Sequence, residues 1–335
     1  MERLNRYREI LNCLPQPAFL MDEKTVLLQN RAAEQAAEAF QKLPAEELTQ
    51  ADAVSSGCWN FRIQRLDDLR LVLAERINLP EAELAAVSAM RLPLSEALSA
   101  AGALMPTVEE QEDPILRMQA AKLNRSLYRM YRSVSNLDLL CSGVQSPRFS
   151  RVDLCMVVQG LELSVPQPCT ASGVTIKTEL PATPVYISCD LQLLEVALLN
   201  LLSNALRYAD PKSCVAVSVA KRNGRAVLTV RNSGVPADMN DVFGDSETAL
   251  MRGTAGVGLA LVRKIASQMG GTFLLHTQEH ETFATLAFPI NLRGESELRN
   301  TVVPYEYTGG FNRVLLQLSD VLPPDVFVPE ALDEI

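Results

Sequence analysis

Three polar residues at helical spacing are the first candidates for chemistry in this chain. Asn200, Asn204 and Arg207 lie within LNLLSNALRY at intervals of four and three, so a helix brings them to one face. An amide oxygen at this spacing can coordinate a hard cation such as Mg²⁺, and a nearby guanidinium can bind phosphate. Polar residues opposite an apolar stripe also form ordinary solvated faces, so a structural interpretation stays open.

A glycine-rich turn follows further along the chain. Gly253, Gly256 and Gly258 lie in GTAGVGLALVRKI, ahead of a run with helical periodicity. Glycines let a backbone approach a ligand closely, and a helix N-terminus offers free N–H groups to phosphate. The turn is not a Walker loop, because no Gly-Lys-Ser/Thr follows, and it is not preceded by the strand of a dinucleotide-binding fold. A plain connection remains the alternative.

The elements around these residues predict an α+β unit over residues 150–290. DLQLLEVALLNLLSNALRYA indicates a helix capped by Asp190, and Asn223-Gly224 between two alternating runs predicts a β-hairpin. GVGLALVRKIASQMGG indicates a helix ending at Gly270, and TFLLHTQEHETFATLAFPI predicts a second hairpin.

Ahead of this unit, residues 81–143 predict a helical hairpin. Two apolar stripes recur at spacings of three and four, with a helix break expected at Pro106 and the acidic loop TVEEQE. One hairpin has little surface to bury both stripes, which favours a dimeric four-helix bundle, and packing on the hairpin's own chain is the alternative. The stripe residues are Val87, Met90, Leu94, Ala97, Ala101 and Leu104, then Leu116, Ala120, Leu123, Leu127, Met130, Val134, Leu137 and Cys141.

Composition excludes several classes of function. The 335 residues carry a net charge of −9, which argues against a nucleic-acid binder because phosphate contacts need clustered Lys and Arg. No apolar run is long enough to span a bilayer, so no membrane insertion is expected. The seven scattered cysteines lack a CxxC pair and fit a reducing compartment, so we expect a cytoplasmic protein.

The order of the motifs is more specific than any one of them. NLLSNALRY, VRNSGVPA, VFG, GTAGVGLALVRKIASQMGGTF and TFATLAFP closely resemble the motif series of the histidine-kinase ATP-binding domain. That domain belongs to a superfamily shared with DNA gyrase, heat-shock chaperones and mismatch-repair proteins. The resemblance implies a two-layer α/β sandwich over residues 146–292, with ATP and Mg²⁺ as cofactors.

The resemblance also assigns roles to single residues. Asn204 is expected to hold Mg²⁺, with Asn200 beside it. Arg207 and Tyr208 are expected near the phosphates and the nucleotide. The full expected cofactor-binding set is Asn200, Asn204, Arg207, Tyr208, Asn232, Gly234, Gly253, Gly256 and Gly258.

Asn232 and Pro236 depart from the family's pattern, and Asn200 separates branches of the superfamily. The family's Asp-x-Gly-x-Gly box is Asn232-Ser-Gly234-Val-Pro236 here. Asn232 keeps a carbonyl acceptor for the adenine amino group but loses the charge, which predicts weaker binding rather than its loss. Asn200 stands where hydrolytic members have a glutamate, and an amide is no general base. A chaperone-like or topoisomerase-like ATPase is therefore disfavoured.

With this domain behind it, the hairpin over 81–145 resembles the dimerisation and phosphoacceptor domain of sensor histidine kinases. The family's His-Glu-x-Arg-Thr/Asn-Pro-Leu aligns with SAMRLPL, which places Ser88 at the histidine, Ala89 at the acid and Leu92 at the Thr or Asn. The two histidines of the chain, His276 and His280, both lie beyond the glycine loop. Serine is a weak nucleophile without an adjacent base. No catalytic residue is therefore expected, and Ser88 marks a degenerate acceptor position.

The two ends of the chain are less specific. Residues 1–80 faintly resemble a PAS sensor domain, and a small domain that only packs and dimerises is the alternative. In the tail, residues 293–335, a short amphipathic helix with Leu315, Leu318 and Leu322 is expected to cover its own chain rather than a partner helix.

Together these features predict a cytoplasmic, dimeric histidine-kinase-like protein of the α+β class, a pseudokinase in two-component signalling. It would bind ATP-Mg²⁺ and regulate a protein partner, such as a response regulator, through the homodimeric bundle over 81–143. A kinase that phosphorylates a partner in trans is one alternative, since anti-sigma-factor kinases belong to the same superfamily. A dimeric scaffold without nucleotide is another.

Overall fold

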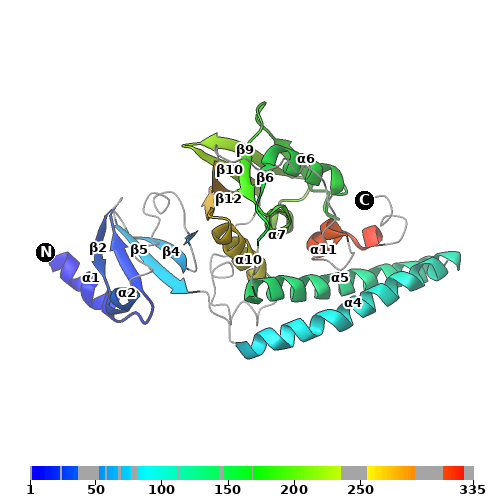
Figure 1. The fold of residues 1–335 in the computed structure, drawn as a ribbon, viewed down its shortest axis with the longest axis horizontal. Helices are drawn as coiled ribbons and strands as arrows, with labels where there is room; N and C mark the ends of the chain where they lie inside the picture. Colours follow the sequence, from blue (N-terminus) through cyan, green and yellow to red (C-terminus); the bar gives the residue numbers. More distant parts are fainter. Residues whose placement is uncertain are drawn as a thin grey trace.

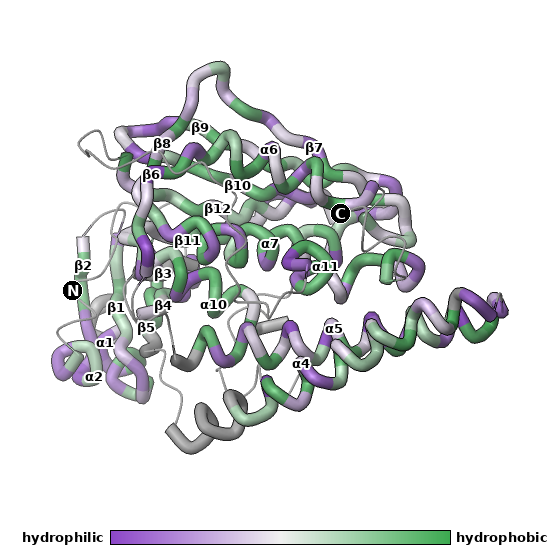
Figure 2. Tube along the Cα trace, turned by 45° about the vertical axis from the view of Figure 1, so that its right-hand side comes forward, coloured by the Kyte–Doolittle hydropathy of each residue, from purple (hydrophilic) through white to green (hydrophobic). Residues whose placement is uncertain are grey.

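The computed structural model shows a mixed helix-and-strand protein from whose main body two long helices extend (Figure 1). Figure 2 shows green, apolar segments gathered in that body. The described residues are 2–22, 25–36, 53–56, 59–66, 69–76, 81–111, 113–142, 147–167, 169–234, 255–290 and 312–327.

The N-terminal part is an antiparallel sheet with two short helices. Because successive side chains of a strand point to opposite faces, the sheet has an apolar cluster on each side. One cluster is built around Phe19 and Phe61, and the other joins Leu20 to Leu11 of the first helix. The elements are α1 (Glu2–Asn12), β1 (Ala18–Met21), β2 (Val26–Gln29), α2 (Arg31–Gln35), β3 (Ala53–Ser56), β4 (Trp59–Leu66) and β5 (Leu69–Arg76).

This sheet continues into the next part of the molecule. Strand β3 pairs antiparallel with β11 (Thr272–Gln278), with Ala53 opposite Leu275 and Ser55 opposite Phe273. The result is one 10-stranded sheet in the order β2-β1-β5-β4-β3-β11-β12-β10-β9-β7. The N-terminal strands therefore extend the edge of the sheet formed by the later ones.

Two long helices, α4 (Glu81–Glu110) and α5 (Pro114–Ser142), lie side by side. The expected break at Pro106 is wrong, because α4 continues through both Pro93 and Pro106. Pro106 has no N–H group to bond the carbonyl of Gly102. Both residues are exposed, so water can bind that carbonyl.

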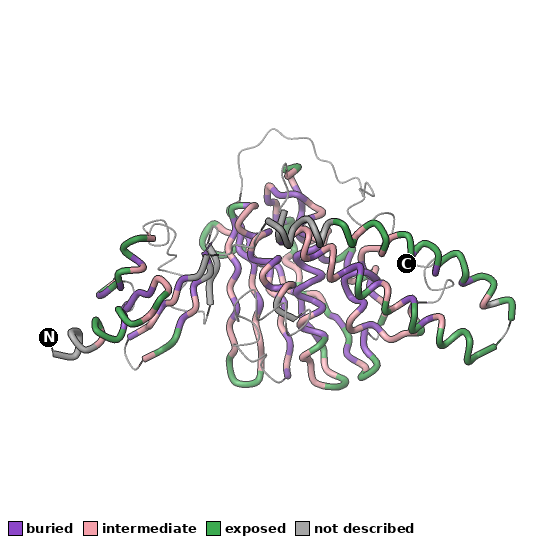
Figure 3. The backbone as a smooth tube through the Cα atoms, turned by 90° about the horizontal axis from the view of Figure 1, so that it is seen from below, coloured by how far each residue is buried: buried purple, intermediate pink, exposed green. Residues whose placement is uncertain are grey.

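The α4/α5 pair buries only part of its apolar surface. Leu98, Ala101 and Met105 of α4 are buried. Several members of the expected stripes stay exposed, and the exposed surface dominates toward the tip of the pair (Figure 3). The most exposed of these are Met90, Leu104, Leu123 and Met130.

Residues 150–290 form a sheet with a helical layer, and the burial of β10 shows why. Its side chains alternate between buried and half-buried along all of Arg225–Ser233, so only one face of the sheet carries the main helical core. The strands of this sheet are β7 (Thr175–Glu179), β9 (Cys214–Arg222), β10 (Arg225–Ser233), β11 and β12 (Glu281–Pro289), and β6 (Ser150–Asp153) and β8 (Tyr186–Cys189) form a separate two-stranded sheet. The helices are α6 (Leu154–Ser164), α7 (Leu191–Tyr208) and α10 (Ala255–Gln268).

The local signals in this unit behave as expected. Asn223 and Gly224 have positive φ angles of 48° and 73° and connect β9 to β10. Asp190 caps α7 by accepting hydrogen bonds from the backbone N–H groups of Gln192 and Leu193. Strands β11 and β12 form the second predicted hairpin.

The tail folds back onto the chain. Helix α11 (Arg313–Leu318) contacts both α5 and α7, and the 3₁₀ turn η2 (Pro324–Phe327) contacts α5. All of 314–318 is buried, so this helix is enclosed on every side rather than amphipathic. Across the described ranges, no helix combines the length and the apolar character needed to cross a membrane.

Candidate functional site

The motifs singled out in the sequence meet at the C-terminal half of α7. At Gly234, just past β10, the φ angle is +153°, and an added Cβ would lie 1.8 Å from the backbone oxygen of Tyr208. At Gly258, in the first turns of α10, an added Cβ would lie 2.9 Å from Asn200 Oδ1. Both approaches need glycine. They hold the end of β10 and the start of α10 against the polar residues of α7.

The other predicted residues that the structure describes lie on these elements. Asn204 is half-buried on α7, one turn after Asn200, and Tyr208 is half-buried at the helix end. Gly256 is the second residue of α10. Gly253 and Pro236 lie outside the described residues.

Asn232 carries an unsatisfied polar atom. Its side chain is buried at the end of β10, and within the described ranges its Nδ2 has no hydrogen-bond partner. A buried polar group without a partner is unfavourable by roughly 1–3 kcal/mol. A polar ligand at this position would remove that penalty, so the observation fits a nucleotide base placed here.

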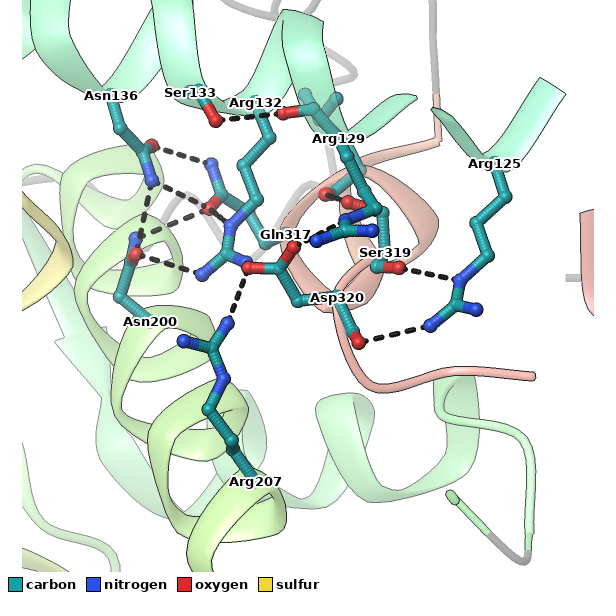
Figure 4. A network of polar contacts seen from close by, with 11 residues as sticks. Arg125, Arg129, Arg132, Ser133, Asn136, Asn200, Arg207, Gln317, Ser319 and Asp320 are labelled. Carbon is teal, nitrogen blue, oxygen red and sulfur yellow. Dashed lines mark hydrogen bonds and ion pairs between the residues drawn. The ribbon is translucent and has the colours of Figure 1, made fainter. Parts of the chain in front are cut away.

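Asn200 is not on a solvated face, although its spacing alone allowed that. Its side chain is buried, and its Nδ2 donates to the Val196 carbonyl at 2.8 Å and to Gln317 Oε1 at 3.2 Å. Its Oδ1 accepts from Asn136 Nδ2 at 3.0 Å and from Arg132 Nη2 at 3.4 Å. Figure 4 shows this amide joining three elements: α7, α5 and the tail.

Arg207 is held by the tail as well. Its Nη2 lies 2.6 Å from Asp320 Oδ2, and the same carboxylate pairs with Arg132 and, at 2.8 Å, with Arg129 Nε (Figure 4). The Asp320 side chain is only 4% exposed. Burial acts to raise the pKa of this carboxyl, but the arginines outweigh it and hold the pKa below its usual value.

A row of arginines on α5 completes the cluster. Arg125 donates from Nε to the Ser319 carbonyl and from Nη2 to the Asp320 carbonyl, both at 3.0 Å. Burial of Arg132 lowers its pKa to about 10, with Asp320 raising it and the nearby Arg207 and Arg129 lowering it further. The cluster is therefore strongly positive apart from one carboxylate.

The α5 and tail members of this site were not predicted from the sequence. Arg125, Arg129, Arg132 and Asn136 recur at intervals of four, three and four. That spacing puts them on one helix face, beside the apolar stripe on which the analysis concentrated. The periodicity was a usable signal, but the tail residues Gln317 and Asp320 have no comparable pattern.

The segment SAMRLPL, interpreted above as a degenerate acceptor, lies on α4. Ser88 is in the helix, Ala89 is exposed, and Leu92 is 67% exposed. Arg91 Nη1 forms an ion pair with Asp138 Oδ2 of α5 at 3.1 Å, which ties the two helices together. Of the two histidines, His280 Nε2 lies 3.3 Å from Asp210 Oδ2, at the β11–β12 turn.

Comparison with known proteins identifies the family of one part of the chain. The family described as histidine kinase-, DNA gyrase B-, and HSP90-like ATPase matches residues 189–292. Residues 189–292 are a histidine-kinase-type ATP-binding domain. This ATP-binding domain contains α7, β10 and α10, which carry the described members of the expected cofactor-binding set.

Relatives of the chain are sensor kinases. The CAI-1 autoinducer sensor kinase/phosphatase CqsS of Vibrio cholerae is 28% identical over 50% of this chain and 26% of its own length. The sensor-like histidine kinase SenX3 of Mycobacterium bovis is 29% identical over 61% of this chain and 50% of its own length. The chain thus matches half or less of the length of these relatives.

Solved structures include similar chains. The histidine kinase AdeS of Acinetobacter baumannii is 20% identical, with a TM-score of 0.41, over 59% of this chain and 95% of its own.

Proposed function

We propose that this chain is a nucleotide-binding, histidine-kinase-like signalling protein that does not phosphorylate itself. The observation that carries the proposal is the contrast between two helices. Helix α7 carries Asn200, Asn204 and Arg207, with Gly258 beside Asn200 and Gly234 beside Tyr208. Helix α4 has Ser88 and Ala89 where the family has its histidine and acid.

The residues present fit ATP and Mg²⁺. Asn204 supplies an amide oxygen, the donor type that hard cations accept, and the metal would neutralise phosphate charge. Within the described ranges, Asn232 has a buried amide donor without a partner at the base end, and Gly234 lets the backbone after β10 pass close to Tyr208. The start of α10, with Gly256, offers backbone N–H groups to phosphate. These residues belong to the proposed cofactor-binding set and lie within the described part of the chain.

Autophosphorylation is not expected, because the acceptor segment lacks three groups. Imidazole is a neutral nucleophile near pH 7, whereas a serine hydroxyl needs an adjacent base. Ala89 supplies none, and the aliphatic Leu92 cannot position water for phosphatase chemistry. We therefore propose a regulatory role for the protein, exerted on a signalling partner such as a response regulator.

We further propose that the α4/α5 pair, within a domain spanning 81–145, forms a homodimer. A groove of about 680 Å³ on the pair is lined largely by apolar side chains. A second copy would cover this groove together with the exposed Leu104 and Leu123. Among the residues lining the groove are Met90, Pro93, Leu94, Met130 and Val134.

Sedimentation tests the dimer. A Met130→Arg variant should sediment as a monomer, since a charge in the interface would be desolvated. Leu163→Arg is the matched control, because Leu163 is 81% exposed on α6, and it should remain dimeric. A monomeric wild-type protein would contradict the proposal.

The N-terminal strands support a sensor domain over residues 1–80. Their order, β2-β1-β5-β4-β3, is that of a five-stranded antiparallel sheet with short helices beside it. We propose a PAS-like input domain here, which would act on the ATP-binding domain through the β3–β11 pairing as well as through α4.

Calorimetry and labelling test the central proposal. ATP-Mg²⁺ should bind the purified protein, and γ-labelled ATP should leave no label on it. Label on the isolated protein would contradict the pseudokinase proposal. Label on an added response regulator alone would favour the trans-kinase alternative, and absence of nucleotide binding would favour the scaffold.

A further inference from the structure

The tail binds side chains of α7 that the proposed function places near the phosphates of the nucleotide. We propose that residues 312–327 are an internal competitor for the nucleotide phosphates, so that nucleotide binding and docking of the tail exclude one another. The inference rests on the proposed nucleotide binding, and it adds a regulatory element to that site. It is carried by Asp320, Gln317 and Phe327.

Asp320 places a carboxylate where phosphate oxygens are expected. Its Oδ2 lies 2.6 Å from Arg207 Nη2, and Arg207 is the side chain assigned to the phosphates. Carboxylate and phosphate bind guanidinium in the same way, through charge-assisted hydrogen bonds. One guanidinium cannot serve both an internal carboxylate and a phosphate at full strength.

The charges around Asp320 suit a polyanion better than a single carboxylate. In the described part of the chain, Asp320 pairs with Arg129, Arg132 and Arg207, and Arg125 donates to its backbone carbonyl. Four cations therefore gather around one anion. A triphosphate carries several negative charges and would neutralise more of this excess than Asp320 does.

Gln317 bonds in a similar way to Asn200, the residue expected beside the Mg²⁺ ligand Asn204. Its Oε1 accepts from Asn200 Nδ2 at 3.2 Å and from Asn136 Nδ2 at 3.3 Å, and its Nε2 donates to Asn136 Oδ1 at 3.0 Å. All three amides are buried. Release of the tail would remove the Gln317 acceptor from Asn200 Nδ2 and leave that donor with the Val196 carbonyl alone.

A third anchor lies away from the arginines. Phe327 is fully buried, its ring centroid lies 5.3 Å from that of Tyr128, and its carbonyl accepts from Asn124 Nδ2 at 3.0 Å. These contacts join the tail to α5 without touching α7. They make it possible to loosen the tail while every arginine is kept.

Displacement of the tail would also change the contacts between the ATP-binding domain and α5. The tail bridges α5 and α7 through Asp320 and Gln317 (Figure 4). Nucleotide that replaces it would break this bridge. The state of the nucleotide site would thereby reach the α4/α5 pair without any phosphate transfer.

Three variants test the competition in full-length protein by calorimetry with ATP-Mg²⁺. Asp320→Asn removes the competing charge, and Phe327→Ala loosens the tail but leaves all four arginines. Asp325→Asn is the matched control, because it makes the same charge change at an exposed position of the same segment. If the tail is docked about nine-tenths of the time, release tightens apparent binding about tenfold.

We expect tighter binding for Asp320→Asn and Phe327→Ala, and wild-type affinity for Asp325→Asn. Tightening in Asp320→Asn alone would show a charge effect and overturn the competition. Equal and measurable affinity in all four proteins would overturn it while leaving the proposed nucleotide binding intact. Absence of binding in all of them would overturn both.

Hydrogen exchange in the wild-type protein gives a second test that needs no variant to fold. Saturating ATP-Mg²⁺ should speed amide exchange within 312–327, because the segment leaves its site. Unchanged or slower exchange in this segment, with nucleotide shown to be bound, would overturn the inference.

Discussion

Helices α7 and α4 each contain a segment that resembles a histidine-kinase motif. They differ in which of the family's side chains they contain. On α7 the polar side chains are present: Asn200 and Arg207 are fixed by hydrogen bonds and ion pairs, and Asn204 lies between them. On α4 the frame residues Arg91 and Pro93 remain, while the reactive positions do not. Under the proposed function, this chain binds nucleotide through α7 and lacks the acceptor chemistry on α4.

The difference extends to what each helix contacts. Asn200 is buried against α5 and the tail, and Arg207 pairs with Asp320 of the tail, so a substitution there disturbs several partners at once. The equivalent surface of α4, around Leu92, is exposed. We therefore expect large effects from changes near α7 and small ones from changes near Ser88.

The largest effect should come from Asn204→Ala. Loss of the amide oxygen removes a Mg²⁺ ligand, so ATP-Mg²⁺ binding should weaken about a hundredfold, equivalent to about 2.7 kcal/mol. Calorimetry checks this, and wild-type protein in EDTA should show the same weakened binding. A variant that binds as tightly as wild type would show that Asn204 is not a Mg²⁺ ligand.

The second largest effect is expected on the stability of the protein, from a substitution at Gly234. Gly234→Ala places a Cβ 1.8 Å from the Tyr208 oxygen, and the φ of +153° is unfavourable for any side chain. The free energy of unfolding should fall by about 2–3 kcal/mol. Gly160→Ala is the control, because nothing lies within 4 Å of its added Cβ in α6. It should leave stability unchanged or raise it by up to about 1 kcal/mol.

A gain is expected at Asn232. Asn232→Asp restores the charge of the family's glycine box, and charge-assisted hydrogen bonds are about twice as strong as neutral ones. Adenine nucleotides should bind roughly three- to tenfold more tightly. Asn223→Asp at the exposed β9–β10 turn should change nothing. Weaker binding in Asn232→Asp would mean that the free amide donor, rather than the acceptor, faces the base.

Acid should release the tail only at low pH. Because the pKa of Asp320 is lowered in the fold, its contribution is fully present above the ordinary value of 3.8 and is lost as pH falls through the lowered pKa. Exchange of 312–327, corrected for intrinsic rates, should be flat between pH 7 and 5. A marked rise in that interval would contradict the ion-pair geometry.

The smallest effect is expected at Ser88. Ser88→His alone should gain no label from γ-labelled ATP, because Ala89 offers no acid to orient the imidazole. The triple variant with Ala89→Glu and Leu92→Thr tests whether the frame of α4 is still competent. Label on the single variant would show that the acceptor segment lacks only its nucleophile.

The sequence was informative wherever local rules decide the structure. The Asn223-Gly224 turn and the cap at Asp190 depend on neighbours in the chain, and the structure contains both. The motif order pointed to the ATP-binding domain, and the family match over residues 189–292 agrees with it. Pro106 shows the limit of such rules. A proline predicts a helix end from local geometry, yet α4 continues, because the helix packs along α5 and the free carbonyl faces water.

By itself the sequence determined which side chains are available: the amides and arginine of α7, the missing histidine of α4, and the glycines. Only the tertiary structure decided what Asn200 and Arg207 contact. Asp320 is 113 residues from Arg207 along the chain, and no periodicity links an unpatterned tail to a helix that far away. Such contacts arise when burial brings opposite charges together in a low-dielectric site, and that juxtaposition exists only in the folded chain.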